Sequence, residues 1–172
     1  MNVLEYTYSE FEEGIKHVAK QIEEDDFDPD YLIGIARGGC VPGVYLSHSL
    51  KKPIIMIQWN TRDDNPFGND YPAWLPREFL AGAKAIIIDD IVDGGTTMIE
   101  LFTSWQNNNG GKKIPLQNIR IAAMYYNVAQ PIKVDYYHRT INRDADDRYI
   151  IFPWEVLPIC PAHVQRIVNG DV

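Results

Sequence analysis

Apolar positions recur along the chain with the period of a helix in some segments and as short unbroken runs in others. From Phe11 to Ile22 they recur every three or four residues, behind a Ser-Glu-Phe-Glu sequence that starts at Ser9 and has the form of a capping box. This pattern predicts a helix over residues 9–24. Short apolar runs, typical of buried strands, occupy residues 31–35, 53–57, 85–88 and 119–125.

Two more helices are predicted between these runs, over residues 41–50 and 97–106. Shorter apolar pieces follow at residues 134–137 and 149–152, and residues 161–168 have the pattern of a last helical turn or two. Strands that alternate with helices indicate an α/β domain with a mainly parallel sheet. At 172 residues, with no internal repeat and no linker, the chain is expected to form a single domain over residues 1–172.

The segment between the second and third predicted strands, residues 58–82, has no clear period and contains three prolines and two glycines. A loop of this length inside a compact domain is usually functional or mobile. Ligands of parallel α/β sheets bind beyond the carboxyl ends of the strands. Both the ARGG sequence that ends at Gly39 and the DDIVDGGTT sequence that starts at Asp89 fall at such ends.

The formal charge of −8 comes from 24 acidic and 16 basic residues, with no block of Lys or Arg, so a nucleic-acid polymer is not an expected partner. The chain has no apolar run long enough to span a membrane and no signal-peptide pattern, so we expect a cytoplasmic protein. Cys40 and Cys160 have no Cys or His neighbour at metal-ligand spacing, and we interpret them as reduced, structural residues.

Candidate chemistry is concentrated in IIIDDIVDGGTTM, residues 86–98. A strand that continues through a glycine-rich turn into a helix directs backbone N–H groups at one point, where a phosphate can bind. Glycines let the backbone come close, and threonines add hydroxyl donors. The phosphate contacts are predicted to come from Gly94, Gly95, Thr96 and Thr97.

Three carboxylates, Asp89, Asp90 and Asp93, accompany this turn. They would repel a phosphate unless they contact sugar hydroxyls, act through a divalent cation or accept a proton. A ligand with a phosphate, a polyol and Mg²⁺ would satisfy the whole segment. Alternatively, the acids simply end a strand and precede a solvated turn capped by Thr96, but the complete arrangement favours a ligand site. Neither the GxxxxGK[ST] pattern nor a GxG turn is present.

The segment resembles the phosphoribosyl-pyrophosphate (PRPP) binding motif of the type I phosphoribosyltransferases: an apolar strand, two acids, two apolar residues and Asp-Thr-Gly-x-Thr. Two further segments agree in order and spacing. Residues 33–43 (IGIARGGCVPG) are similar to the pyrophosphate loop of the family. Residues 148–155 (RYIIFPWE) are similar to the base-binding segment of its 6-oxopurine branch, the xanthine-guanine and hypoxanthine enzymes.

The resemblance implies a parallel sheet flanked by helices, with a small C-terminal hood region and a long mobile lid. It implies an enzyme of purine salvage that transfers a 5-phosphoribosyl group from PRPP to a purine base and releases pyrophosphate, with Mg²⁺ as cofactor. The partners would be PRPP and the base (hypoxanthine, guanine or xanthine), and the protein would be a homo-oligomer, a dimer or a tetramer.

The resemblance also implies roles for single residues. Asp89 and Asp90 would bind the ribose hydroxyls, with Asp89 also reaching the metal through water, and Asp93 would be the general base near purine N7. The pyrophosphate would lie against Arg37, Gly38 and Gly39, where the family often has a strained peptide. The lid contacts would come from Thr61 and Arg62. Tyr149 would stack on the base and the Ile150 carbonyl would contact it, whereas Trp154 would be either a core residue or a base contact.

Two positions depart from the family pattern. Gly94 stands where the family usually has Thr, which removes one hydroxyl from the phosphate site. The family lysine that reads purine O6 falls on Tyr126 or Asn127, neither of which is cationic, although either can donate one hydrogen bond. Lys133 could replace it only with a different loop conformation.

These departures leave two alternatives to a salvage enzyme. The first is a non-catalytic module of the same fold that senses PRPP or a nucleotide. The second is a pyrophosphokinase that makes PRPP, but it would need an ATP site, and the sequence offers no segment for one.

Overall fold

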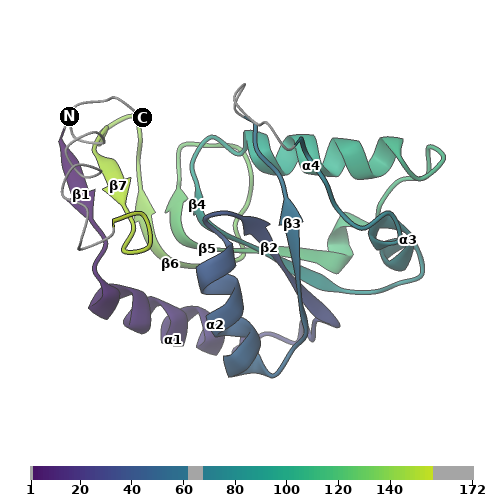
Figure 1. Cartoon of the computed structure of the whole chain (residues 1–172), viewed down its shortest axis with the longest axis horizontal. Coiled ribbons are helices and arrows are strands. Elements are labelled where there is room, and N and C mark those ends of the chain that lie inside the picture. The colour runs from purple at the N-terminus through teal and green to yellow at the C-terminus, as the bar shows by residue number, and fades with distance from the viewer. Residues whose placement is uncertain (1, 62–67, 157–172) are drawn as a thin grey trace.

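A five-stranded parallel sheet forms the centre of the molecule (Figure 1). The structure is a computed structural model and describes residues 2–61 and 68–156. The strand order is β3-β2-β4-β5-β6, and every neighbouring pair is parallel. The strands are β2 (Tyr31–Ala36), β3 (Ile54–Gln58), β4 (Ala85–Val92), β5 (Ile119–Asn127) and β6 (Tyr136–Ile141). The predicted α/β domain with a parallel sheet is confirmed.

Helices cover both faces of this sheet and enclose two hydrophobic cores. One face packs against α1 (Tyr8–Glu24) and α2 (Cys40–Leu50), and the other against α3 (Leu75–Leu80) and α4 (Thr96–Asn107). A 3₁₀ turn, η1 (Leu116–Asn118), precedes β5. Because both faces are covered, the central strands are apolar on both sides, which explains the unbroken apolar runs.

The central strand β4 is longer than the sequence predicts. Ile87 packs into the core with α3 and α4, while its neighbours Ile86 and Ile88 pack into the other core. Pairing with β5 then continues through Asp89 to Val92. The expected strand end at residue 88 is therefore wrong, because backbone pairing with β5 outweighs the low strand propensity of the two acids.

The start of α1 also differs from its prediction. The N-cap is Thr7, not Ser9: the Thr7 side chain accepts the N–H of Glu10 at 3.2 Å, and a Glu10 carboxylate oxygen accepts the N–H of Thr7 at 2.9 Å. Both Thr7 and Ser9 have a glutamate three residues later, so the spacing alone fits either. The fully buried Tyr6 anchors the chain next to Thr7, and the helix begins there.

A small second sheet lies at one end of the molecule, beside the main sheet (Figure 1). It pairs β1 (Val3–Glu5) with β7 (Tyr149–Ile151) in parallel. The strand β1 was not predicted, because three residues give too short a pattern to recognise. This sheet corresponds to the expected hood region, which is therefore built from both the first and the last described strands of the chain.

The last strand of the main sheet is shifted relative to the sequence pattern. The sequence shows only a short apolar piece at residues 134–137, whereas β6 is Tyr136–Ile141. It is an edge strand with polar residues His138 to Thr140 in its middle, so its second half carries no apolar run. The predicted last helical turns at residues 161–168 lie outside the described residues.

The segment over residues 58–82 is only partly a loop. Gln58 and Asp70 pair through two backbone hydrogen bonds of 2.9 and 2.7 Å, and α3 follows. Leu75 and Phe79 of α3 are fully buried in the core. The second half of the segment is thus part of the folded body, and residues 62–67 of the predicted lid lie outside the described residues. Within the part of the chain that is described, every helix falls short of the length and apolarity that crossing a membrane needs.

Candidate active site

Two consecutive carboxylates lie at the C-terminal end of β4. Asp89 is half-buried, and its Oδ1 accepts the N–H of Asp90 at 3.0 Å. Asp90 is 9% exposed, and its Oδ1 accepts the N–H of Ile91 at 2.8 Å. Asp89 is the more accessible of the two to a ligand.

Burial raises the pKa of both carboxyl groups. For Asp89 the second cause of the raised pKa is the charge of Asp90, and for Asp90 it is the charge of Glu155. Glu155 comes from the end of the predicted base-binding segment and accepts the N–H of Phe152 at 2.8 Å. The end of β4 thus gathers carboxyl groups in a partly buried place, where hydroxyl donors or a cation would stabilise their charged forms.

The loop after β2 packs directly against these acids. A Cβ atom on Gly38 would lie 2.1 Å from Asp90 Oδ2, and one on Gly39 would lie 2.1 Å from the carbonyl oxygen of Ile88. Only glycine fits at either position. The side chain of Arg37 is exposed, and the peptide bond between Ala36 and Arg37 is cis. The structure therefore brings the predicted pyrophosphate loop to the predicted ribose site.

The turn after β4 forms the N-terminus of α4. Gly95 is the N-cap with a φ of 76°, and a Cβ there would lie 2.6 Å from the Gln130 side-chain oxygen. No side chain caps this helix, so its first N–H groups are not occupied by one. Thr96 is exposed and Thr97 half-buried at the same end. The predicted phosphate turn thus has the geometry of an anion site at a helix N-terminus.

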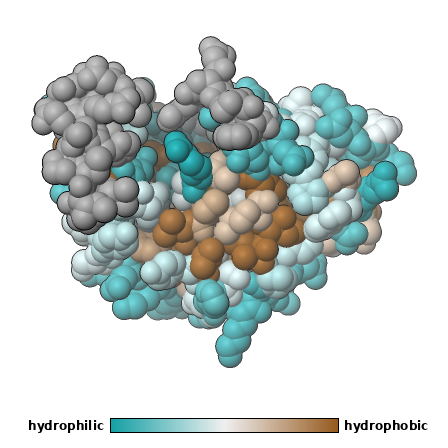
Figure 2. All heavy atoms as spheres, in the orientation of Figure 1, coloured by the Kyte–Doolittle hydropathy of each residue, from teal (hydrophilic) through white to brown (hydrophobic). Residues whose placement is uncertain are grey.

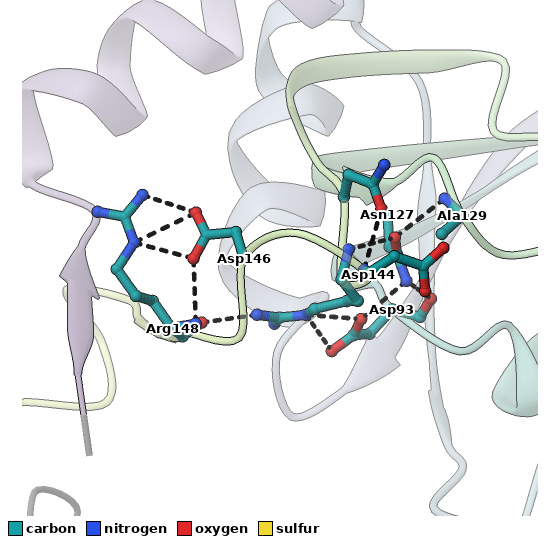
Figure 3. Close-up of polar contacts among 8 residues, drawn as sticks. Asp93, Asn127, Ala129, Asp144, Asp146 and Arg148 are labelled. Carbon is teal, nitrogen blue, oxygen red and sulfur yellow. Dashed lines mark hydrogen bonds and ion pairs between the residues drawn. The ribbon is translucent and has the colours of Figure 1, made fainter.

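Asp93 forms the centre of a polar cluster (Figure 3). Nε of Arg143 donates to Asp93 Oδ1 at 2.9 Å and also lies 3.1 Å from Oδ2. The side-chain amide of Asn127 donates to the Asp93 backbone oxygen at 3.0 Å and to Oδ1 at 3.3 Å. The carboxylate is 44% exposed, so it is oriented by the protein and remains open to a ligand.

Arg143 is the functional candidate that the sequence analysis missed. It lies in the turn after β6, and β6 pairs with β5 so that Ile141 is opposite Asn127. This register places Arg143 beside Asn127 and Asp93. The only signal in the sequence was an arginine just after a strand, in a polar turn that carries no motif.

Tyr126 and Asn127 occupy different environments. Asn127 is 5% exposed, and its side-chain oxygen accepts the N–H groups of Ala129 at 3.0 Å and Arg143 at 3.2 Å. The amide nitrogen and the oxygen of its side chain are thus both hydrogen-bonded within the protein. Tyr126 packs against the core with α3 and α4, 5.3 Å from Tyr137 between ring centroids. Asn127 therefore has no unused donor for a ligand beside Asp93, and Tyr126 belongs to the core with α3 and α4.

Part of the backbone of β7 is not bonded to β1. Tyr149 donates its N–H to the oxygen of Asn2 at 3.0 Å, and the oxygen of Ile151 accepts the N–H of Tyr6 at 2.9 Å. In a parallel pair alternate residues bond to the same neighbour, so the N–H and C=O of Ile150 point away from β1. The expected carbonyl contact of Ile150 is compatible with this register. Trp154 stacks on Phe152 at 5.0 Å and packs into the core.

Two cavities lie at the margins of the main sheet, and neither is lined by Asp89, Asp90 or Asp93. One, of about 590 Å³, lies between the ends of β2 and β3 and residues 70–73, next to Ala36. The other, of about 430 Å³, lies at the hood and is lined in part by Asn142, Asp146 and Arg148. Of the two predicted lid residues, Thr61 is exposed in the segment after β3, and Arg62 lies outside the described residues.

Comparisons with known proteins agree with this geometry. The family model "Phosphoribosyl transferase domain" matches residues 6–157. The structure is similar to a purine phosphoribosyltransferase from Pyrococcus horikoshii, with 26% identity, a TM-score of 0.65 and coverage of 92% of this chain and 98% of that one. No curated protein sequence matches the chain.

Two further structures share the fold. A xanthine-guanine-hypoxanthine phosphoribosyltransferase from Helicobacter pylori has 19% identity and a TM-score of 0.63, over 96% of this chain and 97% of its own. A hypothetical protein from Neisseria gonorrhoeae with bound ppGpp has 21% identity and a TM-score of 0.66, over 99% and 98%. Since the family model spans nearly the entire chain, from α1 through β7, this protein belongs to the phosphoribosyltransferase family and is a phosphoribosyltransferase.

Proposed function

We propose that the protein transfers the 5-phosphoribosyl group of PRPP to a purine base that carries a 6-oxo group. The observation that carries this proposal is the Asp93 carboxylate, held by Arg143 and Asn127 and still exposed, one residue before the glycine turn at the start of α4. The similarity to the purine enzyme from Pyrococcus horikoshii supports a purine as the acceptor.

PRPP would extend along the ends of three elements. The N-terminus of α4, with Gly94, Gly95, Thr96 and Thr97, would bind the 5′-phosphate. Asp89 and Asp90 would accept hydrogen bonds from the ribose hydroxyls, which would offset the cost of their burial. The pyrophosphate would contact the backbone of Gly38 and Gly39, and the exposed Arg37 would neutralise part of its charge.

In the reaction, the lone pair of purine N9 forms a bond to C1′ of the ribose. The bond between C1′ and the pyrophosphate oxygen breaks, and its electron pair leaves with the pyrophosphate. The N7 proton passes to Asp93, so the base becomes neutral as the new bond forms. Arg143 and Asn127 keep the carboxylate in one orientation, which lowers the entropic cost of reaching the reactive geometry.

Mg²⁺ fits this site only as an ion bound mainly to PRPP. Among residues 2–61 and 68–156, no group of three or more His, Cys, Asp or Glu side chains could hold a metal ion. The half-buried Asp89 could contact the ion through water. When bound, the ion would neutralise the charge on the departing pyrophosphate.

A second candidate is a non-catalytic module that senses a nucleotide. It is favoured by the shared fold with the Neisseria gonorrhoeae protein that has ppGpp bound, and by the absence of a lysine at Tyr126 and Asn127. A sensor, however, has no use for an oriented, exposed carboxylate at the Asp93 position.

One experiment separates the two candidates. The protein is incubated with PRPP and Mg²⁺ together with hypoxanthine, guanine, xanthine, adenine or a pyrimidine, and nucleotide and pyrophosphate are measured. We expect both products from at least one 6-oxopurine. Tight nucleotide binding without product from any base would contradict the transfer reaction and support the sensor.

We also propose that the protein forms a homo-oligomer. Figure 2 shows apolar side chains gathered on the face where α2 and β3 are seen, and Val44, Tyr45 and Met56 there are 42%, 49% and 39% exposed. The strand β3 is an edge of the main sheet. Sedimentation at several concentrations tests this proposal, and Tyr45→Glu should shift the protein to monomers.

A further inference from the structure

The polar cluster around Asp93 contains one cation, Arg143, among the described residues that contact it. Its guanidinium links two parts of the site that are far apart in sequence. Nε donates to the Asp93 carboxylate at 2.9 Å, and Nη1 donates to the backbone oxygen of Arg148 at 2.6 Å (Figure 3). Arg148 directly precedes Tyr149, the start of β7. Arg143 therefore connects the proton acceptor to the strand expected to bind the base.

Three N–H groups of Arg143 have no protein acceptor among the described residues. A guanidinium carries five, and its contacts use one on Nε and one on Nη1. In this planar group one N–H of Nη2 lies on the same edge as Nε–H. A ligand atom that lies beside the Asp93 carboxylate would therefore meet a free, charged donor.

Purines present two different patterns at the edge that carries N7. In 6-oxopurines, N7 is flanked by an oxygen acceptor, whereas in adenine it is flanked by an amino group that donates. If Asp93 addresses N7, the group on C6 lies beside it and faces Arg143. An oxo group would receive a charged hydrogen bond, and an amino group would place two donors against each other.

The other donors near Asp93 are already committed. The side-chain amide of Asn127 is bonded to Asp93 and its oxygen to two backbone N–H groups. Tyr126 packs into the core with α3 and α4, and Lys133 forms an ion pair with Asp135 at 2.9 Å. Arg143 is thus the described residue that can take over the recognition of a 6-oxo group.

We propose that Arg143 determines base specificity, by donating to the 6-oxo group of the purine while it orients Asp93. This inference rests on the proposed function, because it assumes that a purine occupies the site beside Asp93. It assigns the selectivity to the turn after β6, not to the end of β5.

The test is equilibrium binding of IMP and AMP, two nucleotides whose bases differ in the 6-substituent, measured by titration calorimetry. We expect the wild-type protein to bind IMP about 10- to 100-fold more tightly than AMP, the discrimination that a good directional contact provides. Arg143→Gln should reduce this ratio to within about threefold, and Arg143→Lys should retain part of it. Arg139→Gln is the matched control, since Arg139 lies on β6 and pairs with Glu10 at 2.9 Å. Thermal unfolding checks that each variant is folded.

The outcomes separate this inference from the proposed function. An unchanged IMP to AMP ratio in Arg143→Gln, or equal wild-type affinities, overturns the role of Arg143 even if the wild-type protein makes nucleotide from a 6-oxopurine. A ratio that depends on Arg143, in a protein that makes no nucleotide, supports the inference and overturns the transfer reaction. A wild-type protein that binds neither nucleotide overturns both.

Discussion

The carboxylate of Asp90 lies against the α-carbon of Gly38, leaving no room for a side chain there. The acids at the end of β4 and the loop after β2 consequently hold each other in place. In the proposed function PRPP binds to both segments at once, so this contact would fix the distance between its proposed ribose and pyrophosphate sites before the substrate arrives.

Gly38→Ala should disrupt this arrangement. Either the loop or Asp90 must move, and we expect the affinity for PRPP to fall at least about 10-fold, with a loss of stability of about 1–3 kcal/mol for overpacking. Calorimetry and denaturant unfolding measure the two effects. In an Asp90→Ala background the same substitution should cost much less stability, and strictly additive effects would contradict the contact.

Asp90→Asn should stabilise the ligand-free protein at alkaline pH. Burial and the charge of Glu155 raise the pKa of Asp90, so the folded state binds its proton more tightly than the unfolded state. The contribution of this group to stability is then greatest at low pH and declines as pH rises through the folded-state pKa. We expect the variant to melt a few degrees above the wild type at pH 8, where about 1 kcal/mol corresponds to roughly 2–4 °C, with a smaller gain at pH 5. An equal gain at both pH values would exclude this electrostatic origin.

Gly94→Thr should strengthen the phosphate site. A Cβ at this position approaches only Thr96 Oγ1, at an ordinary 3.7 Å, so the family's usual hydroxyl can be restored. One additional hydrogen bond, of about 1 kcal/mol, would tighten PRPP binding roughly fivefold. The neighbouring change Gly95→Ala is the contrast, because φ is 76° there and a Cβ would clash with Gln130. Weaker binding in Gly94→Thr would show that the phosphate does not use this turn.

Asp93→Asn should separate catalysis from PRPP binding. The amide keeps the shape of the side chain but cannot accept the N7 proton, so kcat should fall by about 10² or more. The dissociation constant of PRPP should change little, since Asp93 is assigned to the base and not to the ribose. Steady-state kinetics and calorimetry measure these quantities, and a variant with wild-type kcat would end the assignment of Asp93 as the base.

Phe79→Ala distinguishes a core helix from a lid. Phe79 is fully buried and contacts the ring of Trp105 at a centroid distance of 5.0 Å. Its truncation should cost about 3–5 kcal/mol in the free energy of unfolding. Leu80, on the same helix and 38% exposed, is the control, and Leu80→Ala should cost far less. If Phe79→Ala lowered the free energy of unfolding only slightly, α3 would not be part of the core and could belong to a lid.

The sequence was sufficient for the architecture because the buried strands are apolar on both faces. The runs at β2, β3, β4 and β5 were readable for this reason, and the glycines and acids between strand and helix located the site. The polar edge strand β6, the short β1 and the helix α3 within a proline-rich segment were not predicted, because their positions depend on tertiary contacts that leave little local pattern.

The residues of the candidate site likewise divide into those with a local sequence pattern and those that depend on tertiary contacts. Residues that are adjacent in sequence, from Asp89 to Thr97, could be assigned together. The partnership of Asp93 with Arg143 could not, because it depends on the register between β5 and β6. The absence of a lysine at Asn127 is visible in the sequence, whereas the cation that stands near that position is visible only in three dimensions.

The two sheets give the molecule a modular construction. The residues proposed to contact PRPP belong to loops of the five-stranded sheet, while β7 is held by β1 in the hood. Substitutions in Val3–Glu5 would therefore act on the strand proposed to stack on the base without touching any residue assigned to PRPP. For protein engineering and for evolution, the proposed acceptor contacts of β7 and Arg143 and the proposed donor contacts of the other loops become separately adjustable.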